Sequence, residues 1–253
     1  MKISEIKDLL DEKVKQYNTT DFIDTDPIQI PHRFTKKEDI EIIGLLVAII
    51  AWGNRKMIIA NGERLIDIME GEPHLFILDY SSTHVTNSKF VHRTFNTIDL
   101  DFICSALHRL YKFEKGLEHA FSPHSSLPGI KGRIVSFRDK LLATPHEYRS
   151  EKHLSNPMKN SAAKRINMFL RWMVRRDKNG VDFGIWKTIN PADLYLPLDV
   201  HTGNVARKLN ILTRKQNDWK ALEDVMPHLR KMDPFDPVKY DFALFGLGAF
   251  DQF

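Results

Sequence analysis

The sequence contains a single cysteine, Cys104, and no recognisable set of metal ligands. One cysteine excludes an internal disulfide, a four-cysteine iron–sulfur cluster and a cysteine-based zinc site. The 11 histidines are scattered without an HExxH pattern, so we expect no metal site and no cofactor. A metal hydrolase is therefore the least favoured class, and a cytoplasmic location is expected.

Long apolar runs are also missing. The longest, residues 42–52, contains Gly44 and is shorter than the roughly 18 to 20 residues that a membrane helix needs. Residues 1–18 mix acids and bases without an apolar segment, so we expect no signal peptide there. We therefore expect a soluble protein without membrane contact, in which residues 42–52 form a buried helix.

The overall composition is that of a globular protein. With 253 residues, 42% hydrophobic and 28% charged, the chain can form one large domain or two closely packed lobes. The net charge of +4 suits a polyanionic partner but also occurs in proteins that bind no nucleic acid. The position of the charges is therefore more informative than their sum.

Apolar residues recur at helical spacing along most of the chain, and period-2 alternation is rare. Proline, aspartate and glycine interrupt the helical segments, for example in the loop expected at residues 24–32. The pattern predicts an all-α fold with helices over residues 3–17, 36–52, 55–69, 100–112, 134–142 and 161–176, and a short helix that begins at Val200.

The segment SAAKRINMFLRWMVRRDK, residues 161–178, is strongly amphipathic. At about 100° per residue, Lys164, Arg171 and Arg175 fall opposite the apolar positions, with Trp172 beside them. This spacing predicts one core face and one exposed cationic face. Such a face suits phosphate contacts and base stacking, although a plain solvated surface would have the same pattern.

A second informative segment is LYLPLDVHTGNVARKLNIL, residues 194–212. Asp199 stands just before an amphipathic run, where a carboxylate can accept backbone N–H bonds as a helix N-cap. Those bonds and the helix dipole favour its ionised form. A purely structural cap is the alternative. Lys164 lies 35 positions upstream, and an ionised carboxylate with a nucleophilic amine is what cleavage of an N-glycosidic bond requires.

A lysine early in an amphipathic helix, followed by PLDVH at residues 197–201, resembles the helix–hairpin–helix DNA glycosylase superfamily. The lyase-type 8-oxoguanine DNA glycosylases of the archaeal type are the most similar. The resemblance implies a two-lobed helical fold with a cleft between the lobes. One lobe would be a helical bundle of residues 40–160, and the other would combine residues 1–39 and 161–253.

The same resemblance implies the roles of single residues. Lys164 corresponds to the nucleophile and Asp199 to the aspartate that caps a later helix, with His201 at a position where histidine often follows. Lys159 is a rival nucleophile. The segments KRINMFLRWMVR, PLDVHT and KYDFALFGLG are also similar to those of a group of bacterial proteins without an assigned function.

One departure from the superfamily concerns the hairpin before the lysine. The superfamily usually has a glycine-rich L-P-G-hydrophobic-G turn, whereas the corresponding residues here, HLSNPMKNSA, include no glycine. Side chains of Asn156, Lys159 and Ser161 would then have to replace backbone contacts to phosphate. The connection between Lys164 and Asp199 is also longer than in most members.

The function implied is a DNA repair glycosylase with AP lyase activity, acting as a monomer on double-stranded DNA with a damaged base or an abasic site. The base would be flipped out of the stack, and an oxidised base, 8-oxoguanine first, is the expected lesion. Residues expected at the base pocket are Trp172, Phe242 and Phe245. Residues expected to contact DNA are Trp52, Asn54, Arg55, Lys159, Ser161, Arg165, Arg171, Arg175 and His201.

Two other functions fit the same sequence. A non-catalytic DNA- or RNA-binding helical protein would keep the cationic helix without a reactive lysine. A structural or regulatory protein could instead bind another protein through the apolar residues 240–253. In this tail, Gly246 and Gly248 are expected to allow close packing against another helix.

Overall fold

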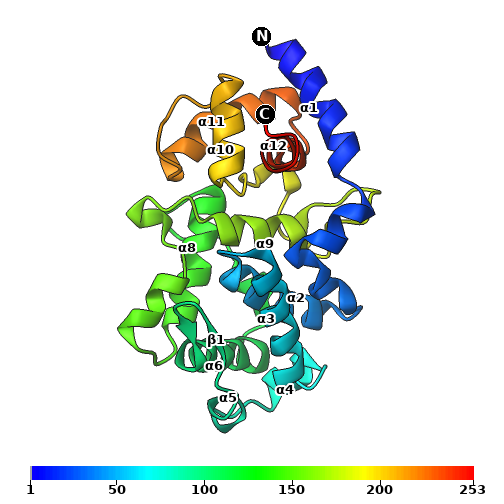
Figure 1. The fold of residues 1–253 in the computed structure, drawn as a ribbon. Coiled ribbons are helices and arrows are strands. Elements are labelled where there is room, and N and C mark those ends of the chain that lie inside the picture. The colour runs from blue at the N-terminus through cyan, green and yellow to red at the C-terminus, as the bar shows by residue number, and fades with distance from the viewer. Residues whose placement is uncertain (1) are drawn as a thin grey trace. The chain divides into compact units, whose positions relative to one another are not determined.

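The computed structural model describes residues 2–253 and is mostly helical (Figure 1). About 63% of the chain is helix, and the described residues contain one two-stranded sheet. In this sheet β1 (Val91–His92) pairs antiparallel with β2 (Phe95–Asn96), with Val91 opposite Asn96. The predicted all-α class is confirmed.

The chain forms two compact units. One comprises Asp26–Asn156 and is called the α2–α8 unit; the other combines Met1–Thr25 with Pro157–Phe253 and is called the α9–α12 unit. The predicted lobes, residues 40–160 against residues 1–39 with 161–253, stay a prediction. Each unit is described by itself.

The α2–α8 unit is built around α2, in which every residue from Ile40 to Ile50 is buried. This confirms the buried helix predicted from the apolar run. Residues 24–32, predicted as a loop, instead lie mostly within short 3₁₀ helices. The elements of this unit are η2 (Pro27–Gln29), η3 (Pro31–Arg33), α2 (Lys37–Ile50), α3 (Arg55–Ile68), α4 (Pro73–Leu78), α5 (Thr83–Thr86), β1, β2, α6 (Thr97–Phe113), α7 (Gly116–Ala120), α8 (Gly129–Leu142) and η4 (Tyr148–His153).

The α9–α12 unit contains both ends of the chain and the two segments singled out in the sequence. Its helices pack around α12, which contacts both α1 and α10; α1 (blue) and α12 (dark red) lie side by side in Figure 1. Its elements are α1 (Ile3–Tyr17), η1 (Thr20–Thr25), η5 (Pro157–Lys159), α9 (Lys164–Val174), η6 (Pro191–Asp193), α10 (Val200–Lys208), α11 (Trp219–Met232), η7 (Pro237–Lys239) and α12 (Tyr240–Ala249).

The glycines of α12 allow this close packing. A Cβ atom added to Gly246 would overlap the ring of Tyr17 in α1. A Cβ atom added to Gly248 would lie 3.0 Å from the Cβ of His201 and 3.1 Å from a methyl of Val205, both in α10. The predicted helix–helix packing at these two glycines is confirmed.

Within residues 2–253, no helix combines the length and the apolar character needed to cross a membrane.

Candidate active site

Lys164 is the first residue of α9 because the preceding chain makes a tight turn. Asn160 and Ala163 both adopt the left-handed region, with φ of 63° and 47°. Asparagine tolerates this conformation better than most residues, and glycine is its usual occupant. The predicted helix start at Ser161 is therefore wrong by three residues, and the chain makes a left-handed turn without the glycines usual in the superfamily.

Asp218 holds this turn in place. Its carboxylate accepts a hydrogen bond from the Asn160 Nδ2 atom at 2.7 Å, and Ser161 forms a β-bridge to the same residue. The Ser161 hydroxyl in turn accepts from the backbone N–H of Ala163 at 3.2 Å. These contacts therefore fix the chain directly before the first turn of α9.

Asp199 is the N-cap of α10, as predicted. Its Oδ1 atom accepts hydrogen bonds from the backbone N–H of Thr202 at 2.9 Å and from the Thr202 hydroxyl at 2.7 Å. The Thr202 hydroxyl also accepts from the Asp199 backbone N–H at 3.0 Å, which completes a reciprocal capping box. Asn217 donates from Nδ2 to the Asp199 carbonyl oxygen at 2.8 Å. Hydrogen bonds therefore fix the side chain, the backbone N–H and the carbonyl oxygen of Asp199, and together they hold the carboxylate in one orientation.

The second carboxylate oxygen of Asp199 faces Lys164. Its Oδ2 atom lies 3.2 Å from the Lys164 Nζ atom, with 38% of the lysine side chain and 15% of the aspartate side chain exposed. Burial by itself would raise the pKa of Asp199, but the Lys164 charge and the Thr202 hydrogen bonds outweigh it and leave the pKa below the ordinary value. The structure thus brings together the lysine and the ionised carboxylate that the sequence paired. Among the described residues, the rival Lys159 makes no comparable ion pair.

A second carboxyl group near this pair, Asp241, was missed by the sequence reasoning. Burial, its main perturbation, raises the pKa of Asp241 to about 7; the nearby Asp199 carboxylate adds to the rise, and the charges of Arg171 and Lys164 oppose it. Asp241 is the only charged residue of α12 (Tyr240–Ala249). A lone acid in an apolar helix was the signal that could have identified it.

The predicted exposed cationic face of α9 is wrong. Arg171 and Arg175 are 3% and 1% exposed, so neither can contact DNA from the surface. Arg171 Nε donates to Asp182 Oδ1 at 3.1 Å, and its Nη1 atom donates to Asp241. Arg175 forms ion pairs with Asp182 at 3.0 Å, with Asp236 at 2.9 Å and with Asp177 at 2.8 Å.

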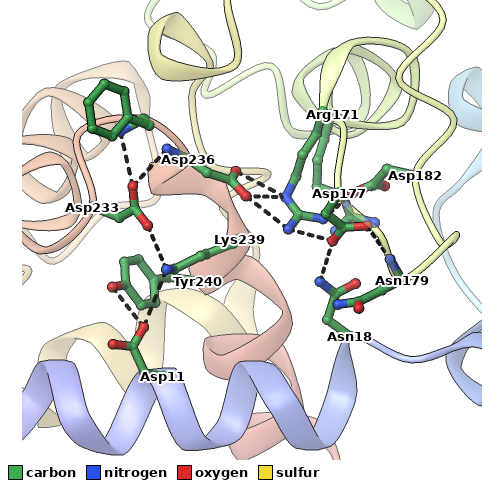
Figure 2. A network of polar contacts seen from close by, with 12 residues as sticks. Asp11, Asn18, Arg171, Asp177, Asn179, Asp182, Asp233, Asp236, Lys239 and Tyr240 are labelled. Atoms are coloured by element: carbon green, nitrogen blue, oxygen red, sulfur yellow. Dashed lines mark hydrogen bonds and ion pairs between the residues drawn. The ribbon is translucent and has the colours of Figure 1, made fainter.

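These ion pairs belong to a network that reaches α1 (Figure 2). Asp233 accepts from the backbone N–H of Asp236 at 3.0 Å and from the Lys239 amine at 2.6 Å. Lys239 also lies 3.4 Å from Asp11 of α1, and Tyr240 donates to Asp11 at 3.0 Å. All of these carboxylates lie outside α9, and Asp236 and Asp241 come from segments more than 60 positions further along the chain, which is why the periodicity of α9 could not reveal them.

Two of the three predicted base-pocket residues are inaccessible. Trp172 is fully buried, and Phe242 is 1% exposed. The Phe242 ring centroid lies 4.4 Å from the Arg171 guanidinium carbon and 5.4 Å from that of Arg175, so it serves the buried network as a cation–π partner. Phe245 is half-buried, and its ring meets that of His201 edge to face at 6.0 Å. Of the three, Phe245 remains the candidate for a base contact.

The other predicted DNA contacts of this unit lie at or near the surface. Lys159 and His201 are exposed, whereas Ser161 and Arg165 are half-buried. The His201 Nδ1 atom lies 3.2 Å from the Gly248 carbonyl oxygen. Burial lowers the pKa of Arg165 to about 10. Their contact with DNA stays a prediction.

In the α2–α8 unit, the predicted contact residues follow the end of α2. Asn54 is exposed and caps α3, accepting from the Met57 backbone N–H at 3.3 Å. Trp52 is half-buried, with its ring stacked on His153 at 5.8 Å, and Arg55 is half-buried at the start of α3. These positions also stay predictions.

No three histidine, cysteine, aspartate or glutamate side chains among residues 2–253 converge in a way that could hold a metal ion. Comparison with the curated proteins and with the solved structures gives no match. A family model described as "Protein of unknown function (DUF2400)" matches residues 26–250, which is most of the chain and includes Lys164, Asp199 and Asp241. The chain therefore belongs to the DUF2400 family.

Proposed function

We propose that the protein is a DNA repair glycosylase with AP lyase activity. The observation that carries the proposal is the Lys164 amine 3.2 Å from the carboxylate of Asp199. A primary amine held beside an ionised carboxylate is suited to attack a sugar C1′ atom and to stabilise the positive charge that develops there. Both side chains are partly exposed, so a substrate can reach them.

The proposed reaction begins when the Lys164 amine, after losing its proton, attacks C1′ of the damaged nucleotide. The N–C1′ bond forms while the glycosidic bond breaks, and its electron pair leaves with the base, which takes up a proton. Opening of the sugar ring gives a Schiff base between Lys164 and C1′. β-Elimination then removes the proton at C2′ and breaks the C3′–O bond, which nicks the strand.

In this proposal the two carboxyl groups, Asp199 and Asp241, have different roles. Asp199, with its lowered pKa, stays ionised and stabilises the oxocarbenium-like transition state. Asp241 has a pKa of about 7, so it exchanges a proton near neutral pH. Carboxyl groups with pKa values that differ in this direction are typical of sites where one group stabilises charge and another handles protons.

The finer parts of the proposal rest on the resemblance of the sequence. They are a two-lobed helix–hairpin–helix arrangement, a monomer that binds double-stranded DNA, and 8-oxoguanine as the first lesion to test. The left-handed turn at residues 160–163, directly before Lys164, supports the comparison with a hairpin that precedes the nucleophile.

The test is borohydride trapping of the full chain on duplexes that carry 8-oxoguanine or an abasic site. We expect a covalent adduct with the natural sequence that is lost in Lys164→Gln and kept in Lys159→Gln, the matched change at the rival lysine. Asp199→Asn should keep DNA affinity and reduce the trapping rate at least 100-fold, because the transition state loses its neighbouring charge.

The alternative, a non-catalytic DNA-binding protein, is also decided by this experiment. Tight, salt-sensitive binding of both duplexes without any adduct would favour that function. An adduct that survives in Lys164→Gln but disappears in Lys159→Gln would refute the assignment of the nucleophile.

A further inference from the structure

Helix α10, which begins at the residue after Asp199, also lines a pocket of about 310 Å³. We call it the α10 pocket. Its polar lining consists of His201, Asn204, Arg207 and Lys208, and Phe253 is among its apolar lining residues. No side chain of the lining carries a carboxylate, so the lining side chains concentrate positive charge.

The charged groups of the α10 pocket differ from Lys164, Arg171 and Arg175 of the candidate site, because no carboxylate side chain is paired with them. The Lys208 ammonium lies 5.8 Å from the centroid of the Phe253 ring, and within residues 2–253 it has no carboxylate at ion-pair distance. Arg207 donates to the Arg214 carbonyl oxygen at 2.8 Å and to the amide oxygen of Asn217 at 2.5 Å, both uncharged acceptors. The pocket therefore presents a net positive field to an anion.

The polar residues of the α10 pocket lie in a row along the helix axis. His201, Asn204 and Lys208 follow one another at intervals of three and four residues, so they form one stripe along α10. The stripe starts two residues after Asp199 and ends in the last turn of the helix. At 1.5 Å per residue, Lys208 lies about 12 Å along the axis from the first residue of α10.

We propose that the α10 pocket binds a backbone phosphate of the DNA strand near the reacting sugar. This inference rests on the proposed function and extends its footprint on DNA. A distance of about 12 Å corresponds to roughly three to four base-pair steps at 3.4 Å each. In this proposal α10 lies along the duplex, so the phosphate bound by Lys208 and Asn204 is roughly three to four nucleotides from the sugar held at Lys164.

The main experiment measures the salt dependence of binding to a duplex with a non-cleavable abasic-site analogue and ten base pairs on either side. Each phosphate contact by a cation adds about 0.9 to the slope of log affinity against log salt. Lys208→Ala should lower this slope by about one and weaken binding about eightfold at 0.1 M salt. Lys220→Ala, which removes an exposed lysine of α11 in the same unit, serves as the control.

Shortened duplexes locate the contact. Cutting the duplex to two base pairs on one side of the analogue, then on the other, should remove the difference between Lys208→Ala and the natural sequence for one of the two truncations. Equal slopes for Lys208→Ala and Lys220→Ala, or a Lys208 effect that survives both truncations, would overturn the proposal.

Two further readouts keep the inference distinct from the proposed function. Inorganic phosphate that stabilises the natural protein but not Lys208→Ala, with equal slopes on DNA, would assign the pocket to free phosphate and refute the strand contact. The second readout is borohydride trapping by the natural sequence. Failure of the proposed function would abolish trapping in the natural sequence, whereas failure of this inference would leave it intact.

Discussion

Replacement of Asp241 by asparagine tests the electrostatics of the candidate site directly. Asparagine has the shape of a protonated aspartate, and its amide oxygen can still accept from Arg171. In the natural protein, burial raises the pKa of Asp241 from 3.8 to about 7, even though Arg171 and Lys164 oppose the rise. The variant therefore stays uncharged at every pH, whereas the natural carboxyl group loses its proton as the pH rises through about 7.

The sign of the effect follows from proton linkage. Between pH 4 and pH 7 the folded state binds a proton at Asp241 that the unfolded state has released, so stability falls as pH rises. With a pKa of about 7 in the folded state, this contribution falls by about 2.5 kcal/mol between pH 5 and pH 8, at 1.36 kcal/mol per pKa unit. Asp241→Asn lacks it, so its stability relative to the natural protein should improve by about that amount over the same interval.

The assay is urea unfolding, followed by circular dichroism, at several pH values from 5 to 8. Asp193→Asn, a change at an exposed carboxylate of the same unit, is the control and should run parallel to the natural protein. If the stability curves of Asp241→Asn and the natural protein are also parallel, Asp241 does not titrate in this range. Its proposed role in handling protons would then be refuted.

Two further predictions concern packing in the same unit. Arg175→Met should destabilise the fold by about 3 to 5 kcal/mol, because the buried Asp182 and the neighbouring Asp236 lose a cationic partner. Lys220→Met, at an exposed position of α11 in the same unit, should leave stability within about 0.5 kcal/mol of the natural protein. The measurement is the free energy of unfolding in urea, and equal effects of Arg175→Met and Lys220→Met would contradict the buried network. Gly246→Ala should destabilise by about 1 to 3 kcal/mol because the added methyl overlaps the Tyr17 ring, and an unchanged unfolding midpoint would show that α1 does not pack there.

Much of the helical framework could be predicted because it depends on local pattern. The apolar run at residues 42–52 indicated a buried helix, and α2 is buried from Ile40 to Ile50. Asp199 was identified as a cap because an aspartate before an amphipathic run has few other local roles, and the capping box with Thr202 confirms it. Local rules apply to such features because the interacting groups are within four residues of each other.

The interior of the α9–α12 unit could not be predicted in the same way. Periodicity separated Arg171 and Arg175 from the apolar positions of α9 and suggested a solvent-facing stripe. Their partners Asp182, Asp236 and Asp241 follow them by between 7 and 70 positions in the chain. A buried arginine looks like an exposed one in sequence when the carboxylates that neutralise it come from other elements.

The sequence by itself determined the all-α class, the buried α2 helix and the cap at Asp199. It also suggested, as a hypothesis, that Lys164 pairs with that aspartate. Only the tertiary structure decided that their charged atoms lie 3.2 Å apart, that the buried Asp241 is near enough for both charges to shift its pKa, and that Trp172 and Phe242 lie in the interior. The physical reason is the range of the interactions. Helix formation, capping and the burial of a helix that is apolar on all sides follow from local sequence. The burial of charged side chains, their ion pairs and their pKa values depend on which distant segments pack together.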